Sequence, residues 1–255
     1  MAGLITTAMR TTATTATIML ESSPGQVVSS AALQRLLAWL SPSFPVGAFS
    51  YSHGLEWAIE DGTVATAADL EGWLGDVLCH GAGRNDAILF VQTYAAAATG
   101  DSGRLLAIVE LAAALQPSKE RRRESCAQGT AFLSAVAATW PHPRLAASAA
   151  VLKAEPAVAY PVAVAVAAAA HDVPVGASLV AYLNAFVANI VSAGIRAIPI
   201  GQTEGQRAIA MLAPLVEEIA ASSLHACLDD LGGAAFRADI ASMKHETQYT
   251  RLFRS

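Results

Sequence analysis

The segment from Trp39 to Trp57 reads WLSPSFPVGAFSYSHGLEW and divides the start of the chain into two apolar segments. Each of its two prolines disfavours the helical conformation for the residue before it, so residues 41–47 are not expected to be helical. One helix is expected before this break, over 31–40, and a second after it, over 49–60. The pattern alone predicts a tight corner between two helices, which turn chemistry explains without any functional role.

Helical periodicity continues through the rest of the chain, and no segment alternates apolar and polar residues as a half-buried strand does. Alanine, the best helix former, dominates the apolar residues, which make up 54% of the composition. The sequence therefore predicts the all-α class, a single-domain helical bundle of about ten helices. After the first two, the expected helices lie at 66–80, 86–98, 101–115, 118–138, 145–152, 159–170, 174–197, 202–228 and 238–244.

The chain is expected to divide into three parts. Residues 1–30 are rich in threonine and serine and are interpreted as a disordered leader, followed by one helical domain over 31–235. Residues 236–255 form a C-terminal tail in which Leu252 and Phe253 lie among arginines. Free in water, such a tail buries too little apolar area to offset the entropy of ordering it. It is therefore expected to be mobile until it docks into a groove on a partner.

Composition excludes several classes of function. Charged residues make up 15% of the chain, so apolar side chains must reach the surface, as they do at protein interfaces. The net charge is −5 and no long basic run is present, which argues against a nucleic-acid partner. Three scattered cysteines favour a reducing cytoplasm. The longest apolar run, 157–170, is too short to span a membrane and contains a proline, so no membrane association is expected.

The chain is also short of catalytic groups. His53 and Glu56 lie three residues apart on an expected helix face, but two ligands do not make a metal site. No phosphate-binding glycine loop, GxSxG or HExxH motif occurs. The charged run 119–124 is explained most simply as a solvated helix face, although part of it could face a partner. The sequence therefore predicts no enzyme, no bound metal and no cofactor.

Four segments resemble, in order, the characteristic segments of one family. They are SPSFPVGAFSYSHGLE at 41–56, KERRRESCAQG at 119–129, AIPIGQTEGQR at 197–207 and MKHETQYTRLFRS at 243–255. The set is similar to the UreF family of urease accessory proteins. Residues 139–175 match no pattern of that family that we can identify, which leaves partner contacts in the middle of the chain undefined.

The resemblance implies an all-helical, cytosolic, non-enzymatic chaperone for urease maturation. Such a protein bridges the accessory protein UreD, also called UreH, and the GTPase UreG. The complex delivers nickel to the urease apoenzyme, and the UreF-like subunit is expected to be a homodimer. UreD is expected to dock on the C-terminal side and UreG on another face.

The resemblance also implies which residues contact partners. Glu56 and Arg196 match charged positions of the family that face the GTPase, and Asp86 matches a further acidic position. As exposed charges, Glu56 and Arg196 are expected to be replaceable without loss of the fold. The other partner-binding candidates lie in the two C-terminal matched segments: Gln202, Arg207, His245, Glu246, Arg251, Leu252, Phe253 and Arg254.

Two alternatives remain open from the sequence. The protein could regulate the GTPase by supplying an arginine in trans, for which Arg196 or Arg207 is the candidate. It could also be a generic helical scaffold that has no connection with nickel.

Overall fold

The computed structural model describes residues 27–155 and 157–255, and within them the chain forms helices, turns and loops but no strand. The predicted all-α fold is confirmed. Residues 1–26, which make up most of the predicted leader, lie outside the described part. The described residues form α1 (Ser30–Trp39), α2 (Leu55–Glu60), α3 (Ala67–His80), α4 (Ala82–Thr99), α5 (Ser102–Ala114), α6 (Lys119–Thr139), α7 (Pro143–Leu152), α8 (Tyr160–Ala170), α9 (Val175–Ala197), α10 (Gln202–Ser223) and α11 (Phe236–His245).

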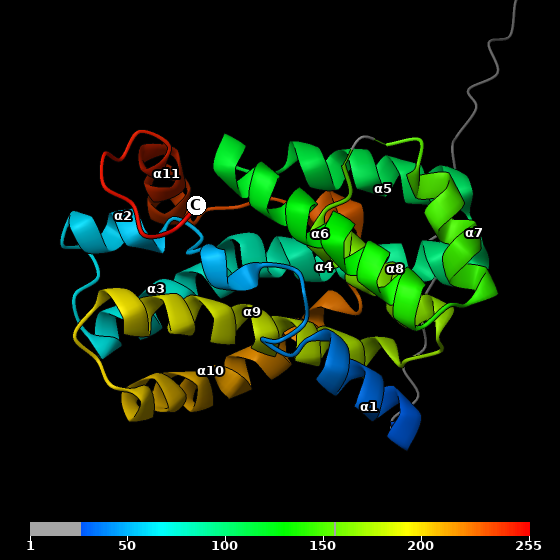
Figure 1. Cartoon of the computed structure of the whole chain (residues 1–255), viewed down its shortest axis with the longest axis horizontal. Coiled ribbons are helices and arrows are strands. Elements are labelled where there is room, and N and C mark those ends of the chain that lie inside the picture. Colours follow the sequence, from blue (N-terminus) through cyan, green and yellow to red (C-terminus); the bar gives the residue numbers. More distant parts are fainter. Residues whose placement is uncertain (1–26, 156) are drawn as a thin grey trace, which may run out of the picture.

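Helix α8 is the centre of the bundle. Every residue from Pro161 to Ala170 is buried, and nearly all of them are alanine or valine. Helices α4 and α6 pack along it, with α9 and α7 on its other sides (Figure 1). Small side chains allow these close approaches. At Gly129 of α6, for example, a Cβ would lie 2.0 Å from the carbonyl oxygen of Val158. The alanine content therefore has a packing role.

Helices α9 and α10 form a hairpin that packs against α3 along one side of the bundle (Figure 1). Within the described residues, α9 is the one helix long and apolar enough to cross a membrane by composition. However, 56% of its most apolar window is buried against the rest of the protein, as in an ordinary core helix. Pro214 lies inside α10, and that helix ends at Ser223, earlier than the predicted end at 228.

The segment after the proline-rich break differs from the prediction of one helix over 49–60. A single 3-10 turn forms at Ala48–Ser50, and α2 begins only at Leu55. Between them His53 and Gly54 both have positive φ, 60° and 78°, which interrupts a right-handed helix. A Cβ on Gly54 would lie 2.8 Å from the Ser242 backbone nitrogen of α11, so this turn also lets α11 approach. The prediction was wrong here because it did not include α11 as a neighbour.

The predicted start of the next helix, at residue 86, was also wrong, because Gly83 was taken as a helix breaker. The sequence predicted a break at Gly81 and Gly83, followed by a helix from residue 86. In the structure only Gly81 separates two helices, and α4 already begins at Ala82. Gly83 is buried, and a Cβ there would lie 2.8 Å from the Cα of Leu78. Its role is therefore close packing of α3 and α4.

Candidate functional site

The C-terminal segment is fastened to the body of the protein through Glu56 on α2. The Glu56 carboxylate accepts hydrogen bonds from the backbone N–H groups of Leu252, at 2.5 Å, and Phe253, at 3.0 Å. Its side chain is only 12% exposed, and its Oε2 also lies 2.9 Å from Nε2 of His245. A carboxylate is suited to this position because it can accept several hydrogen bonds from donors that would otherwise be unpaired.

His245, the last residue of α11, lies between two carboxylates. Its side chain is fully buried, with Nε2 facing Glu56 and Nδ1 2.5 Å from Oε2 of Glu120 on α6. Arg251 completes the group by contacting the other Glu120 oxygen at 2.6 Å. The end of α11 and the following segment are therefore joined to both α2 and α6.

The last residue of the chain is joined to a second buried group. Ser255 donates from its hydroxyl to Glu124 of α6 at 2.5 Å, and its carbonyl accepts from the Ser52 N–H at 2.8 Å. Glu124 is 1% exposed and pairs with Arg121 and with His53, whose Nδ1 lies 2.5 Å away. Burial alone would raise the pKa of Glu124, but the Arg121 guanidinium and His53 lower it to about 2. Glu124 is therefore a carboxylate in the folded protein.

Arg196, near the end of α9, holds the tail by stacking. Its guanidinium carbon lies 3.7 Å from the ring centroid of Phe49 and 4.4 Å from that of Phe253. Its Nη1 also donates to the Phe49 carbonyl at 2.8 Å. Phe253 is 4% exposed. We call Glu56, Glu120, Glu124 and Arg196 the tail clamp.

The structure therefore brings five of the predicted partner-binding residues into one cluster. Contacts within the chain hold these five residues together, and the charged ones among them are engaged in these contacts. The five are Glu56, Arg196, His245, Arg251 and Phe253. The expectation of a mobile tail also differs from the structure. Sequence reasoning treated the tail as having no apolar surface or carboxylates of its own chain to bind. The tail clamp supplies the carboxylates, and the hydrophobic core that covers Phe253 supplies the apolar surface.

The remaining predicted residues lie apart from this cluster. Asp86 on α4 is buried and accepts a hydrogen bond from Tyr182 at 2.7 Å, so its carboxylate is not on an outer face. Glu246 accepts from the backbone N–H of Lys119 at 2.7 Å. The last group is exposed and accessible to partners: Gln202 and Arg207 on α10, with Leu252 and Arg254 in the tail.

Sequence reasoning missed an apolar surface on α11. Phe236, Ile240 and Met243 are 66%, 54% and 50% exposed, and their spacing places them on one face of the helix. Tyr249 and Leu252, both exposed, follow in the tail. We call Phe236, Ile240 and Met243 the α11 apolar face. The four- and three-residue spacing of these three was visible in the sequence and could have identified it. In Figure 1, α11 lies at the periphery, beside α2 and the C-terminus.

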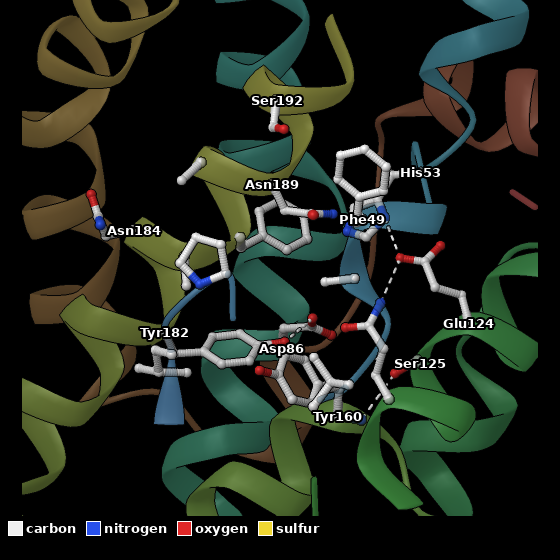
Figure 2. Close-up of a pocket in the computed structure, with 18 of the residues that line it drawn as sticks. Phe49, His53, Asp86, Glu124, Ser125, Tyr160, Tyr182, Asn184, Asn189 and Ser192 are labelled. Atoms are coloured by element: carbon white, nitrogen blue, oxygen red, sulfur yellow. Dashed lines mark hydrogen bonds and ion pairs between the residues drawn. The ribbon is translucent and has the colours of Figure 1, made fainter. Parts of the chain in front are cut away.

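A cavity of about 250 Å³ lies on the inner side of the proline-rich segment. Figure 2 shows Phe49 and His53 from that segment, Asp86 from α4, Glu124 from α6, and Tyr182 and Asn189 from α9 around it. Burial raises the pKa of Asp86 to about 6, although the Tyr182 hydrogen bond and the Arg121 charge oppose this. Burial and the Arg121 charge also lower the pKa of His53. The polar groups thus converge on one hollow.

The described residues contain no group of three His, Cys, Asp or Glu side chains that could hold a metal ion. The charged groups of the site are engaged in fastening the C-terminal segment. These features define a helical protein whose ordered C-terminal side presents an apolar surface.

Comparison with known proteins identifies the family. A family model for UreF matches residues 64–213 and so includes the segment 139–175, in which the sequence alone showed no pattern of the family. A protein named urease accessory protein UreF from Rhodopseudomonas palustris (strain HaA2) is 55% identical over 225 residues, 88% of this chain and 94% of that protein. One of the same name from Xanthobacter autotrophicus is 54% identical over 220 residues, 86% and 90% of the two chains. The chain belongs to the UreF family.

Proposed function

We propose that the protein is a non-enzymatic cytoplasmic chaperone for urease maturation, which bridges UreD (UreH) and the GTPase UreG. In this role it takes part in delivering nickel to the urease apoenzyme within their common complex. Its relatives carry the name urease accessory protein. The proposal is also consistent with a site built for contact, since its charges secure a surface and the described residues hold no cluster of metal ligands.

The observation that supports a docking role most strongly is the α11 apolar face. Three large side chains at half or more of their full exposure on one short helix leave apolar area in water that a partner would cover. Leu252, in the tail, is also exposed, and its backbone N–H is held by Glu56 of the tail clamp. A pre-ordered apolar surface loses less entropy on binding than a mobile one. We assign this face to UreD.

We place the contact with UreG on a different surface from the α11 apolar face. Arg196 is held between two phenylalanine rings and two carbonyl oxygens, so it would have to leave these contacts to reach a nucleotide on a GTPase. If an arginine acts in trans on bound nucleotide, Arg207 is the better candidate because its side chain is exposed on α10. Met211 on the same helix is 69% exposed, which is consistent with a homodimer or another protein contact there.

The test is co-purification of tagged protein with UreD and UreG from cells that express all three. Ile240→Asp introduces a charge at the centre of the α11 apolar face and should reduce recovery of UreD at least tenfold, because that charge must be desolvated in the complex. The melting temperature should stay near that of the parent, since Ile240 is 54% exposed.

Leu37→Asp is the matched control, because Leu37 is 68% exposed on α1, a different helix. It should leave recovery of UreD unchanged. Equal loss in both variants would argue against a specific α11 surface. Failure of the parent protein to recover either UreD or UreG would refute the bridging role itself.

A further inference from the structure

The cavity inside the proline-rich segment has aromatic walls and a carboxylate at its base. Phe49, Tyr160, Tyr182 and Phe186 contribute rings to its lining, and Asn189 and Ser192 of α9 contribute polar groups. Figure 2 shows the Asp86 side chain between Tyr182 and Tyr160. The volume of the cavity, about 250 Å³, is small compared with typical ligand pockets and suits a single head group.

The charges that face this cavity do not balance. Arg121 and Glu124 form an ion pair, so their charges offset one another. Burial and Arg121 lower the pKa of His53, which leaves that ring neutral at pH 7. Tyr182 remains a neutral hydroxyl, because burial raises its pKa. One negative charge therefore remains above about pH 6, on the Asp86 carboxylate.

Asp86 also has spare capacity for hydrogen bonds. Tyr182 donates to one carboxylate oxygen at 2.7 Å, and no side-chain donor reaches the other oxygen among the described residues. A 6% exposed carboxylate with one hydrogen bond is costly to bury, and a bound cation would offset that cost. Chelation of a metal ion is not favoured, since the described residues contain no three His, Cys, Asp or Glu side chains placed to hold one ion, and Glu124 is already paired with Arg121 and His53.

We propose that this cavity binds the head of a nitrogen cation, a primary ammonium or guanidinium group on a short aliphatic stem, with Asp86 as its counter-ion. The flat aromatic walls suit such a group, because ring faces attract cations within about 6 Å. The cation donates to the free Asp86 oxygen, and its stem leaves toward the mouth at Phe49, which is 67% exposed. This site is independent of the proposed role in urease maturation and of the α11 apolar face.

The direct test is a calorimetric titration of the whole protein with propylguanidinium chloride. Propylurea is the control ligand because it has nearly the same shape without the charge. The cation should bind at least tenfold more tightly than propylurea. Asp86→Asn should reduce binding of the cation at least tenfold, while Asp172→Asn, at an exposed aspartate outside the cavity, should leave it unchanged.

The pH dependence gives a second readout that needs no variant. A bound cation favours the ionised carboxylate, so affinity should rise between pH 5 and pH 7, and binding at pH 6 should release protons. The other titratable groups that face Asp86 or the same cavity are Arg121, Glu124, Tyr182 and His53. The first three keep their charge in that range, whereas His53, whose pKa is lowered from 6.5, can only gain a proton toward the acid end, which weakens cation binding in the same direction. Equal binding of propylurea, unchanged affinity in Asp86→Asn, or no binding by the parent would each overturn the proposal. If Asp86→Asn fails to fold, the ligand pair and the pH dependence decide.

The nitrogen cation could belong to a free small molecule or to a basic side chain of a partner protein. The peptide acetyl-Ala-Arg-Ala-amide carries the guanidinium head on a polypeptide and separates the two sources. Binding of both ligands with similar affinity supports a partner's side chain, and binding of propylguanidinium alone supports a small molecule. Both results support the cation site.

Discussion

Replacing Glu124 with alanine is expected to lower the free energy of unfolding by about 3–5 kcal/mol, the usual cost of leaving one member of a buried ion pair alone. Glu124 is 1% exposed and contacts Arg121, His53 and Ser255. Without it, the buried Arg121 guanidinium loses its carboxylate and the end of the tail loses its side-chain partner. Urea denaturation of parent and variant measures the effect.

Glu110→Ala is the control for this substitution, because Glu110 is an exposed glutamate in the middle of α5. Its effect should lie within about 0.5 kcal/mol of zero. A loss below about 1 kcal/mol in Glu124→Ala would contradict the pairing described here, since it would mean that Arg121 does not depend on this carboxylate.

Acid denaturation should also reveal the contribution of the Glu124 carboxylate to stability. The pKa of Glu124 is lowered in the folded protein to about 2, from an ordinary value of 4.5. A lowered folded-state pKa contributes stability that is present above the ordinary value and is lost as the pH falls from 4.5 toward 2. The contribution corresponds to about 3 kcal/mol. Glu124→Ala should lack this part of the pH profile.

The second large effect is expected for Glu56→Ala. This substitution removes the acceptor for the Leu252 and Phe253 N–H groups and one of the two carboxylates that contact His245. The expected loss is about 2–4 kcal/mol, from the buried His245 ring losing one of its carboxylates, from the freed N–H groups and from Phe253 leaving its site. The tail should then become mobile, and its amides should exchange with solvent rapidly. Hydrogen exchange followed by mass spectrometry detects this change in residues 246–255.

Glu60→Ala tests whether the effect is specific, since Glu60 lies on the same helix but is exposed. It should change neither the stability nor the exchange of the tail appreciably. This expectation replaces the view of Glu56 as a surface charge that could be removed at no cost. Protection of the tail in Glu56→Ala equal to that in the parent would show that other contacts are sufficient.

The sequence predicted the helices well because their signals are local. Thr66 and Ser118, for instance, form side-chain caps at the start of α3 and α6, where the sequence placed the beginnings of two helices. The positions of α1, α5 and α8 followed in the same way from apolar periodicity and flanking prolines. Such features depend on a few neighbouring residues, so a single sequence contains them.

The candidate site was only partly predictable, because its contacts join distant parts of the chain. Glu56 and His245 are separated by 189 residues, and their contact exists only after α2, α6 and α11 have packed together. Family resemblance selected several of the right residues but not their partners. It also placed Asp86 among the partner-facing residues, whereas packing of α4 buries its side chain. The exposure of Phe236, Ile240 and Met243 likewise depends on which face of α11 the body of the protein covers.

Glu56 acts, above all, by holding the C-terminal tail in place. A double-mutant cycle in the free energy of unfolding tests it most directly, with Glu56→Ala, Phe253→Ala and the double variant. If Glu56 holds the tail, Phe253→Ala should cost about 2 kcal/mol or more in the parent and almost nothing once Glu56 is gone. Losses that simply add would mean that Phe253 stays in its site without Glu56, and would contradict the claim.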